Sequence, residues 1–274
     1  MPTERSRWRH LGATLLSCGL AFALVACDDD DDDDDSGGFG PPQTEGLPTH
    51  EALRTALQAV VGEDNGGLDL NMWATVVDRS GIVVGVAFSG VGVGDQWLLS
   101  RVISAQKATT ANGLSLDGLA ISTANLWAPT QPGGSLFGLQ ESNPVNPDVA
   151  YEGDASTFGT PNDPMTGKRV GGVNVFGGGV ALYNSAGQKI GAVGVSGDTS
   201  CADHNIAWKL RDRLVLDFVP AGVADGGTTD NIVYDIGLDG TSAGGFGHPE
   251  CSAEATTIGE QLPVTHPISA PPAT

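Results

Sequence analysis

The sequence predicts an α+β fold in which helices pack against one antiparallel sheet. Apolar residues recur at helical spacing in three separate segments, and two groups of short valine-rich runs lie between those segments. Short turns between such runs are typical of antiparallel pairing, because parallel strands need long crossover connections. The predicted order is helix, hairpin, helix, three-stranded group and helix.

The first helix and hairpin are predicted between residues 50 and 89. The apolar positions of this helix are Ala52, Leu53, Ala56, Leu57, Val60 and Val61. Gly62 and the polar run after it end the helix. The valine-rich runs 72–78 and 82–89 are separated by Arg79-Ser80-Gly81, where glycine favours a turn, and they therefore predict a hairpin.

A second amphipathic helix is predicted from Asp95, as its N-cap, to about Asn112. This helix carries Lys107 among small residues, which would let another backbone or a flat ligand approach closely. Between about Leu114 and Gly171 the sequence loses its periodicity and contains six prolines. Long irregular segments in compact domains are usually functional or disordered.

Three glycine-separated strands are predicted next, over residues 173–176, 180–183 and 189–195, although 173–183 could form one bulged strand. Ser200 and Asp203 resemble a capping box at the start of the third helix, which Pro220 ends. Residues 231–236 are a candidate further strand, and the chain from Ile258 is expected to be loose.

The N-terminus predicts a lipoprotein signal peptide over residues 1–26. Three arginines precede an apolar run that is shorter than a typical transmembrane helix. This run ends in Leu24-Val25-Ala26-Cys27, which resembles the bacterial lipobox, so Cys27 is the expected lipidation site. An ordinary signal peptide with an incidental cysteine is the alternative. Lipidation would place the protein in the cell envelope, on the periplasmic face of either membrane or at the cell surface.

The remaining chain divides into a tether, a domain and an extension. Residues 27–46 include eight consecutive aspartates, whose mutual repulsion favours a flexible, solvated tether. A domain is expected over 47–219, with an irregular insertion at about 114–170, and a C-terminal extension over 220–274. One domain of this length can bury a hydrophobic core of its own.

The charge of the chain excludes some partners. The leader holds three of the 13 basic residues and one of the 33 acidic ones, so ten and 32 remain, a formal charge of −22. The eight aspartates of the tether contribute −8 of this charge, so the remainder of the chain carries −14. Nucleic acid and anionic membrane surfaces require a basic face, so both are excluded as partners, and only the lipid would contact the membrane.

The cysteines predict a disulfide. Cys18 would leave with the leader and Cys27 would carry lipid, so Cys201 and Cys251 remain to pair in an oxidising compartment. A zinc site formed by these two cysteines with His204 and His248 is the alternative.

No catalytic constellation is found. Ser196, Asp203 and His204 could supply serine-hydrolase chemistry by residue type, but the segment 194–197 does not complete the glycine-x-serine-x-glycine pattern of a nucleophile elbow, because Asp198 stands where the second glycine belongs. The glycines at 90–94 lack the residues that complete a nucleotide-binding motif. The sequence therefore favours a non-enzymatic protein over an enzyme.

Three stretches carry a family resemblance. They are Val76-Val77-Asp78-Arg79-Ser80-Gly81, then residues 105–111, and then 171–173 continuing through 190–197 to Asp203 and Ala207. In this order they resemble the GlcG/HbpS-like haem-binding family, also called haem-degrading, over about residues 50–217. The resemblance implies a profilin-like fold with a five-stranded antiparallel sheet and flanking helices, frequent homo-oligomers and, in some members, binding of haem or a related tetrapyrrole.

The resemblance also implies positions for a ligand site. Lys107, Thr109 and Thr110 are signature residues near a pocket. Residue type alone adds further candidates: His204, one helical turn before Trp208, and His248 could present imidazoles to haem or a metal, and Tyr151 is a ligand by type. A capping or loop role is the alternative for each.

The expected function is therefore that of a lipid-anchored, extracytoplasmic haem-binding protein. A sensory or structural interaction module and a haem- or cofactor-processing enzyme are the alternatives.

Overall fold

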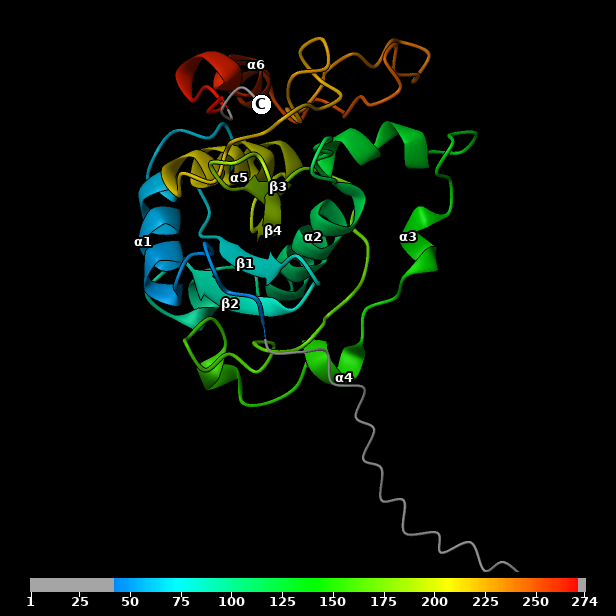
Figure 1. Ribbon diagram of the computed structural model, residues 1–274. Coiled ribbons are helices and arrows are strands. Elements are labelled where there is room, and N and C mark those ends of the chain that lie inside the picture. Colours follow the sequence, from blue (N-terminus) through cyan, green and yellow to red (C-terminus); the bar gives the residue numbers. More distant parts are fainter. Residues whose placement is uncertain (1–41, 271–274) are drawn as a thin grey trace, which may run out of the picture. The chain divides into compact units, whose positions relative to one another are not determined.

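A four-stranded antiparallel sheet lies at the centre of the protein, as described by a computed structural model over residues 42–270 (Figure 1). The strand order is β2-β1-β4-β3. The strands are β1 (Trp73–Asp78), β2 (Val83–Phe88), β3 (Gly179–Tyr183) and β4 (Lys189–Ser196). The predicted signal peptide, the lipidation of Cys27 and most of the tether lie outside the described residues.

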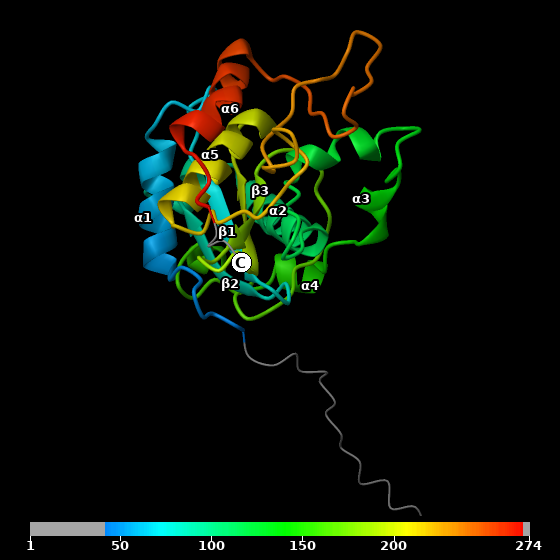
Figure 2. The same cartoon turned by 45° about the horizontal axis from the view of Figure 1, so that its top comes forward.

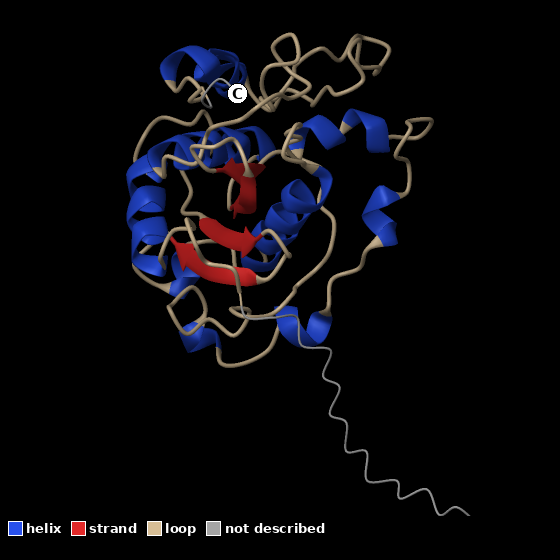
Figure 3. Ribbon diagram, viewed as in Figure 1, coloured by secondary structure: helices blue, strands red, loops and turns tan. Residues whose placement is uncertain are grey.

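Helices cover both faces of the sheet (Figure 3). On one face lie α1 (His50–Val61) and α5 (Ser200–Arg213), and on the other lies α2 (Ser100–Leu114). A further helix, α6 (Ala253–Thr265), packs on the outer side of α5 (Figures 1 and 2). The predicted α+β class, the first helix, the hairpin and the third helix are confirmed. Within the described part of the chain no helix has the length and apolar character needed to cross a bilayer.

The sheet is buried on both faces, so its strands alternate between two cores. Val76 and Val193 pack toward α1 and α5, whereas Val77 and Ala192 pack toward α2. Gly194 allows β4 and α2 to approach closely, because a Cβ added there would lie 2.0 Å from the Ser104 carbonyl oxygen. The small residues of α2 therefore accommodate a neighbouring strand.

Two of the predicted strands do not form, and the five-stranded sheet implied by the resemblance is wrong for the described residues. In residues 173–176, the Asn174 N–H donates to Thr110 Oγ1. In residues 231–236, the Ile232 N–H donates to His204 Nε2. Backbone groups that a ladder would need are thus taken by side chains. The profilin-like relationship stays a prediction.

The N-caps of α2 and α5 differ from the predicted ones. The second helix begins at Ser100 rather than after Asp95, because the Asp95 carboxylate accepts from the N–H groups of Val91 and Gly92 within a tight turn. The N-cap of α5 is Thr199, whose hydroxyl accepts from Ala202 N–H.

The excursion between α2 and β3 is irregular, as predicted, and contains only short helical turns. These are η2 (Ala124–Leu126), η3 (Ala128–Thr130), α3 (Leu139–Ser142), α4 (Pro147–Ala150) and η4 (Ala155–Thr157), while η1 (Val93–Asp95) precedes α2. A buried ion pair holds the excursion to α2, because Arg101 Nε donates to Asp163 Oδ2 at 2.9 Å and Arg101 Nη1 donates to the Ala150 carbonyl at 2.8 Å.

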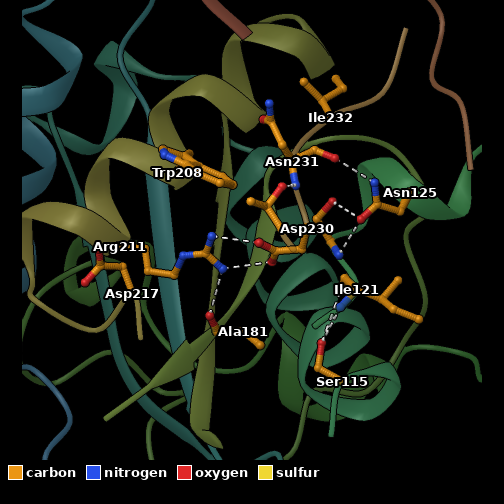
Figure 4. Close-up of polar contacts among 12 residues, drawn as sticks. Ser115, Ile121, Asn125, Ala181, Trp208, Arg211, Asp217, Asp230, Asn231 and Ile232 are labelled. Atoms are coloured by element: carbon orange, nitrogen blue, oxygen red, sulfur yellow. Dashed lines mark hydrogen bonds and ion pairs between the residues drawn. The ribbon is translucent and has the colours of Figure 1, made fainter. Parts of the chain in front are cut away.

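The C-terminal extension is ordered against α5, so the prediction of a loose end from Ile258 is wrong. Ser252 caps α6, and the Asn205 side chain donates to the Ala255 carbonyl. Figure 4 shows the buried Arg211 guanidinium donating to both carboxylate oxygens of Asp230, at 2.7 and 2.8 Å. The extension therefore covers the side of α5 that does not pack on the sheet.

Candidate functional site

A pocket of about 370 Å³ opens beside the C-terminal end of α2. Its volume is within the range of small-molecule sites, toward the lower end. The residues that line it are Thr109, Thr110, Gly113, Leu114, Leu139, Asn143, Pro144, Gly171, Gly172 and Val173. Two of the predicted site residues, Thr109 and Thr110, therefore lie in one pocket.

The walls of this pocket are apolar or neutral. Thr110 is fully engaged, since its hydroxyl donates to the Gln106 carbonyl and accepts from Asn174 N–H. The Thr109 hydroxyl oxygen is buried and has no hydrogen-bond partner among the described residues. A buried hydroxyl without a partner is costly.

Two glycines shape the far wall. Gly171 and Gly172 adopt φ of +71° and +83°, a conformation that favours glycine. A Cβ on Gly172 would meet Val145 Cγ2 at 2.6 Å, whereas one on Gly113 would meet no atom within 4 Å. Gly113 thus leaves part of the space in the pocket open.

Lys107 lies on the same helix but does not line the pocket, and its side chain is buried in an ion pair. Its Nζ donates to Asp203 Oδ2 at 2.5 Å and to the Val195 carbonyl at 3.1 Å, and both side chains are almost fully buried. Burial lowers the pKa of Lys107 and raises the pKa of Asp203 to about 6, because desolvation disfavours both charges. The pair joins α2 to the start of α5.

The two candidate histidines are buried and bonded to the backbone. His204 Nε2 accepts from Ile232 N–H at 3.0 Å, which places the proton of the neutral ring on Nδ1. His248 Nε2 lies 3.3 Å from Gly177 N–H, and its Nδ1 lies 2.7 Å from the Pro249 carbonyl. Burial lowers the pKa of His204 to about 3 and that of His248 to about 4. Neither ring lines the pocket.

The predicted site residues therefore fall into three places. Lys107, His204 and His248 surround the glycine segment 177–179, as shown by the close approach of Gly177 to His204 and of Gly178 to Lys107. Thr109 and Thr110 line the pocket. Tyr151 follows α4, is largely exposed and does not line the pocket.

The two cysteines form the predicted disulfide between Cys201 and Cys251. This bond contradicts the zinc alternative, because sulfur atoms that are bonded to each other cannot bind the metal as thiolates. Among residues 42–270, no group of three metal-ligating side chains comes together.

Sequence reasoning missed the partners of the buried cations. Asp203 was noted as a capping residue, as a possible catalytic acid and at the end of a family stretch, but not as the partner of Lys107, and Asp163 and Asp230 attracted no notice. Leu139 and Asn143 reach the pocket from the excursion, which carries no short-range signal of that placement.

Comparison with known proteins gives the class of this protein. The sequence matches the model of the family described as "Haem degrading protein HbpS-like" over residues 49–211. The chain belongs to this HbpS-like family.

Two solved structures are similar to part of the chain. The Klebsiella pneumoniae protein ORFY is 26% identical, with a TM-score of 0.41, over 61% of this chain and 90% of that one. The PduOC:Heme complex is 22% identical, with a TM-score of 0.41, over 60% of this chain and 89% of that one. No curated protein matches the sequence.

Proposed function

We propose that this protein binds haem or a related tetrapyrrole in the pocket at the C-terminal end of α2. The observation that carries the proposal is the neutral pocket itself, which Thr109 and Thr110 line together with apolar side chains. Both threonines lie in the part of the chain that matches the HbpS-like family model.

The pocket suits the ring of a tetrapyrrole better than its metal. Leu114, Leu139, Pro144 and Val173 offer apolar contact to a flat macrocycle, and a pocket of this volume encloses part of one. The lining contains hydroxyl and amide groups but no histidine, cysteine, methionine or tyrosine. Haem supplies a redox-active iron when it is bound, and Thr109, Thr110 and Asn143 are the polar groups that would face it. No acid, base or charged nucleophile lines the pocket, so the proposal is binding rather than catalysis.

Titration with hemin tests this proposal. The chain from Gly40 onward contains the whole described core and forms one compact unit. We expect a saturable shift of the Soret band. Gly113→Phe should weaken binding at least tenfold, because the added side chain enters open pocket space. Gly118→Phe is the matched control, since a Cβ there also meets no atom within 4 Å but lies outside the pocket.

Three results would count against the pocket. They are the absence of a saturable shift, equal affinity in Gly113→Phe, and loss of binding in a folded His204→Gln or His248→Gln variant. The last result would assign the ligand to a buried imidazole.

We also propose that the protein is held outside the cytoplasm by lipid on Cys27. The leader and the lipobox-like segment before Cys27 support this location. The Cys201–Cys251 disulfide also suits an oxidising compartment. Mass spectrometry of the mature N-terminus should find acyl groups on Cys27, and an unmodified Cys27 or a cleavage site elsewhere would contradict the proposal.

A further inference from the structure

Large apolar side chains are exposed where two loops meet at one end of the sheet. Trp97, Leu98 and Leu99 precede α2 with 54%, 55% and 62% of their surface exposed, and Val91 is 95% exposed. Leu68 on the neighbouring loop is also exposed. We call this set, Leu68, Val91 and residues 97–99, the apolar patch. Consecutive exposed residues of this size in a soluble domain mark interaction sites more often than chance exposure does.

The two loops are held together by specific contacts, so the patch has a defined shape. Asn71 forms an isolated β-bridge with Gln96, and its side chain donates to the Asp95 carbonyl. The indole N–H of Trp73 donates to the Trp97 carbonyl at 2.9 Å, which fixes the backbone and leaves the Trp97 ring free. A rigid aromatic side chain of this kind loses little conformational entropy when a partner covers it.

The charges beside the patch are mainly negative. Asp69 directly follows Leu68, Asp95 lies two residues before Trp97, and both aspartates are exposed. The basic residue nearby, Arg54, stacks on the Phe88 ring and donates to the Gly90 carbonyl, while Arg101 is buried against Asp163. The net charge of the chain after the tether is also strongly negative. A partner that covers the patch must therefore present positive charge around its apolar side chains.

The patch lies at the opposite end of β1 from the start of the described chain. Gln43 N–H donates to Asp78 Oδ2 at the last residue of β1, whereas Trp97 lies at Trp73, the first residue. Six residues of strand separate these ends by roughly 17 Å. The first described residues of the chain therefore leave the patch uncovered.

From these observations we infer that the apolar patch docks a protein segment whose aromatic or aliphatic side chains are flanked by lysine or arginine. Trp97 and Leu98 are the anchors of this surface, and Asp69 and Asp95 select the charge of the partner. The patch is separate from the pocket, so its occupation does not depend on a tetrapyrrole.

A pair of synthetic peptides tests the chemistry of this surface. Both carry the same fluorescein label and the same tryptophan and leucine residues, flanked in one by lysines and in the other by glutamates. We expect fluorescence anisotropy to show at least tenfold tighter binding of the lysine peptide to the chain from Gly40 onward. The affinity should fall as salt is raised, because the attraction is between exposed charges.

Variants then locate the binding. The double variant Trp97→Ser, Leu98→Ser should bind the lysine peptide at least tenfold more weakly. Phe137→Ser, which removes a comparably exposed aromatic ring elsewhere, should bind it normally. Asp69→Asn keeps the backbone conformation, since asparagine tolerates the φ of 59° found there, and should reduce the preference for the lysine peptide two- to threefold.

Four outcomes would overturn the inference. Equal binding of the two peptides would show that the surface does not select positive charge. Normal binding of the lysine peptide by the double variant would show that the apolar patch is not the binding site. Sedimentation that shows self-association lost in the double variant assigns the patch to a second copy of the chain. Binding to phosphatidylcholine vesicles that is lost in the same variant assigns it to a membrane.

Discussion

Acid should destabilise this protein through its two buried histidines. In the unfolded chain an imidazole has a pKa near 6.5, whereas burial lowers the pKa of His204 to about 3 and that of His248 to about 4. A group with a lowered folded-state pKa contributes stability above its unfolded pKa and loses it as the pH falls toward the folded value. When the pH falls from 7 to 4, protonation of each histidine should therefore lower the free energy of unfolding by about 3 kcal/mol, at about 1.4 kcal/mol per pH unit.

Asp203 acts in the opposite direction. Its folded-state pKa is raised to about 6, so its contribution is fully present below pH 3.8 and is lost as the pH rises through 6. Acidification from pH 7 to pH 4 therefore restores about 2 kcal/mol at this residue. The three groups together should lower the free energy of unfolding by about 4 kcal/mol.

Urea unfolding at pH 7, 5.5 and 4 measures this change. His204→Gln removes one titrating group and keeps a side-chain oxygen that can accept from Ile232 N–H. The variant should lose about 3 kcal/mol less than the wild type between pH 7 and pH 4. Because the comparison is between slopes, a constant loss of stability in the variant does not affect it. Equal pH dependence in the two proteins would refute the reasoning.

Two further predictions concern packing and the covalent link. Gly194→Ala should lower the free energy of unfolding by about 3 kcal/mol, because its Cβ would meet the Ser104 carbonyl at 2.0 Å and Ala108 N at 2.4 Å. Gly118→Ala should change it by no more than about 0.5 kcal/mol in the same urea titration, and equal effects would contradict the close packing of β4 on α2. Replacing both Cys201 and Cys251 by serine should cost about 4 kcal/mol on the loop-entropy model, since the bond closes a loop of 50 residues. A change in denaturation midpoint worth less than about 1 kcal/mol would show that the contacts of the extension suffice without the bond.

Several elements were predicted correctly from their local sequence pattern. The α1 helix buries Leu53, Leu57 and Val60 at helical spacing, and its sequence shows the same pattern. The β1–β2 hairpin has a glycine at its turn with φ of +81°, as the Arg79-Ser80-Gly81 segment indicated. In these elements the local pattern and the tertiary contacts agree.

The errors arose where distant side chains decide the backbone conformation. Residues 231–236 have the composition of a strand, but His204 accepts the Ile232 N–H and the Asn125 side chain donates to the Asn231 carbonyl. The α6 helix contains Pro263 and several threonines, which disfavour a helix locally, and it is stabilised by the Ser252 cap and by packing on α5. No reading of nearby residues could have supplied these contacts.

The candidate site was predicted in part. The motif around Lys107 directed attention to the helix beside the pocket, and Thr109 and Thr110 line that pocket. The sequence could not distinguish a lysine that faces a ligand from one that is buried against Asp203, because the two residues are 96 positions apart. The second wall of the pocket comes from the irregular excursion, where no periodicity indicates which residues turn inward.

The enclosure of α5 imposes an order on folding when the chain emerges with its N-terminus first. Its inner side packs on strands that precede it in the chain, but its outer side is covered by Asp230, Ala255 and the backbone of His266, which accepts from the Trp208 indole. The guanidinium of Arg211 lacks Asp230 until the chain has emerged past residue 230. A chain truncated before residue 230 therefore leaves one side of α5 exposed to solvent. The Arg211 guanidinium and the Trp208 indole N–H then lack their partners, Asp230 and the His266 carbonyl. The last fifth of the sequence is thus needed to complete the burial of α5.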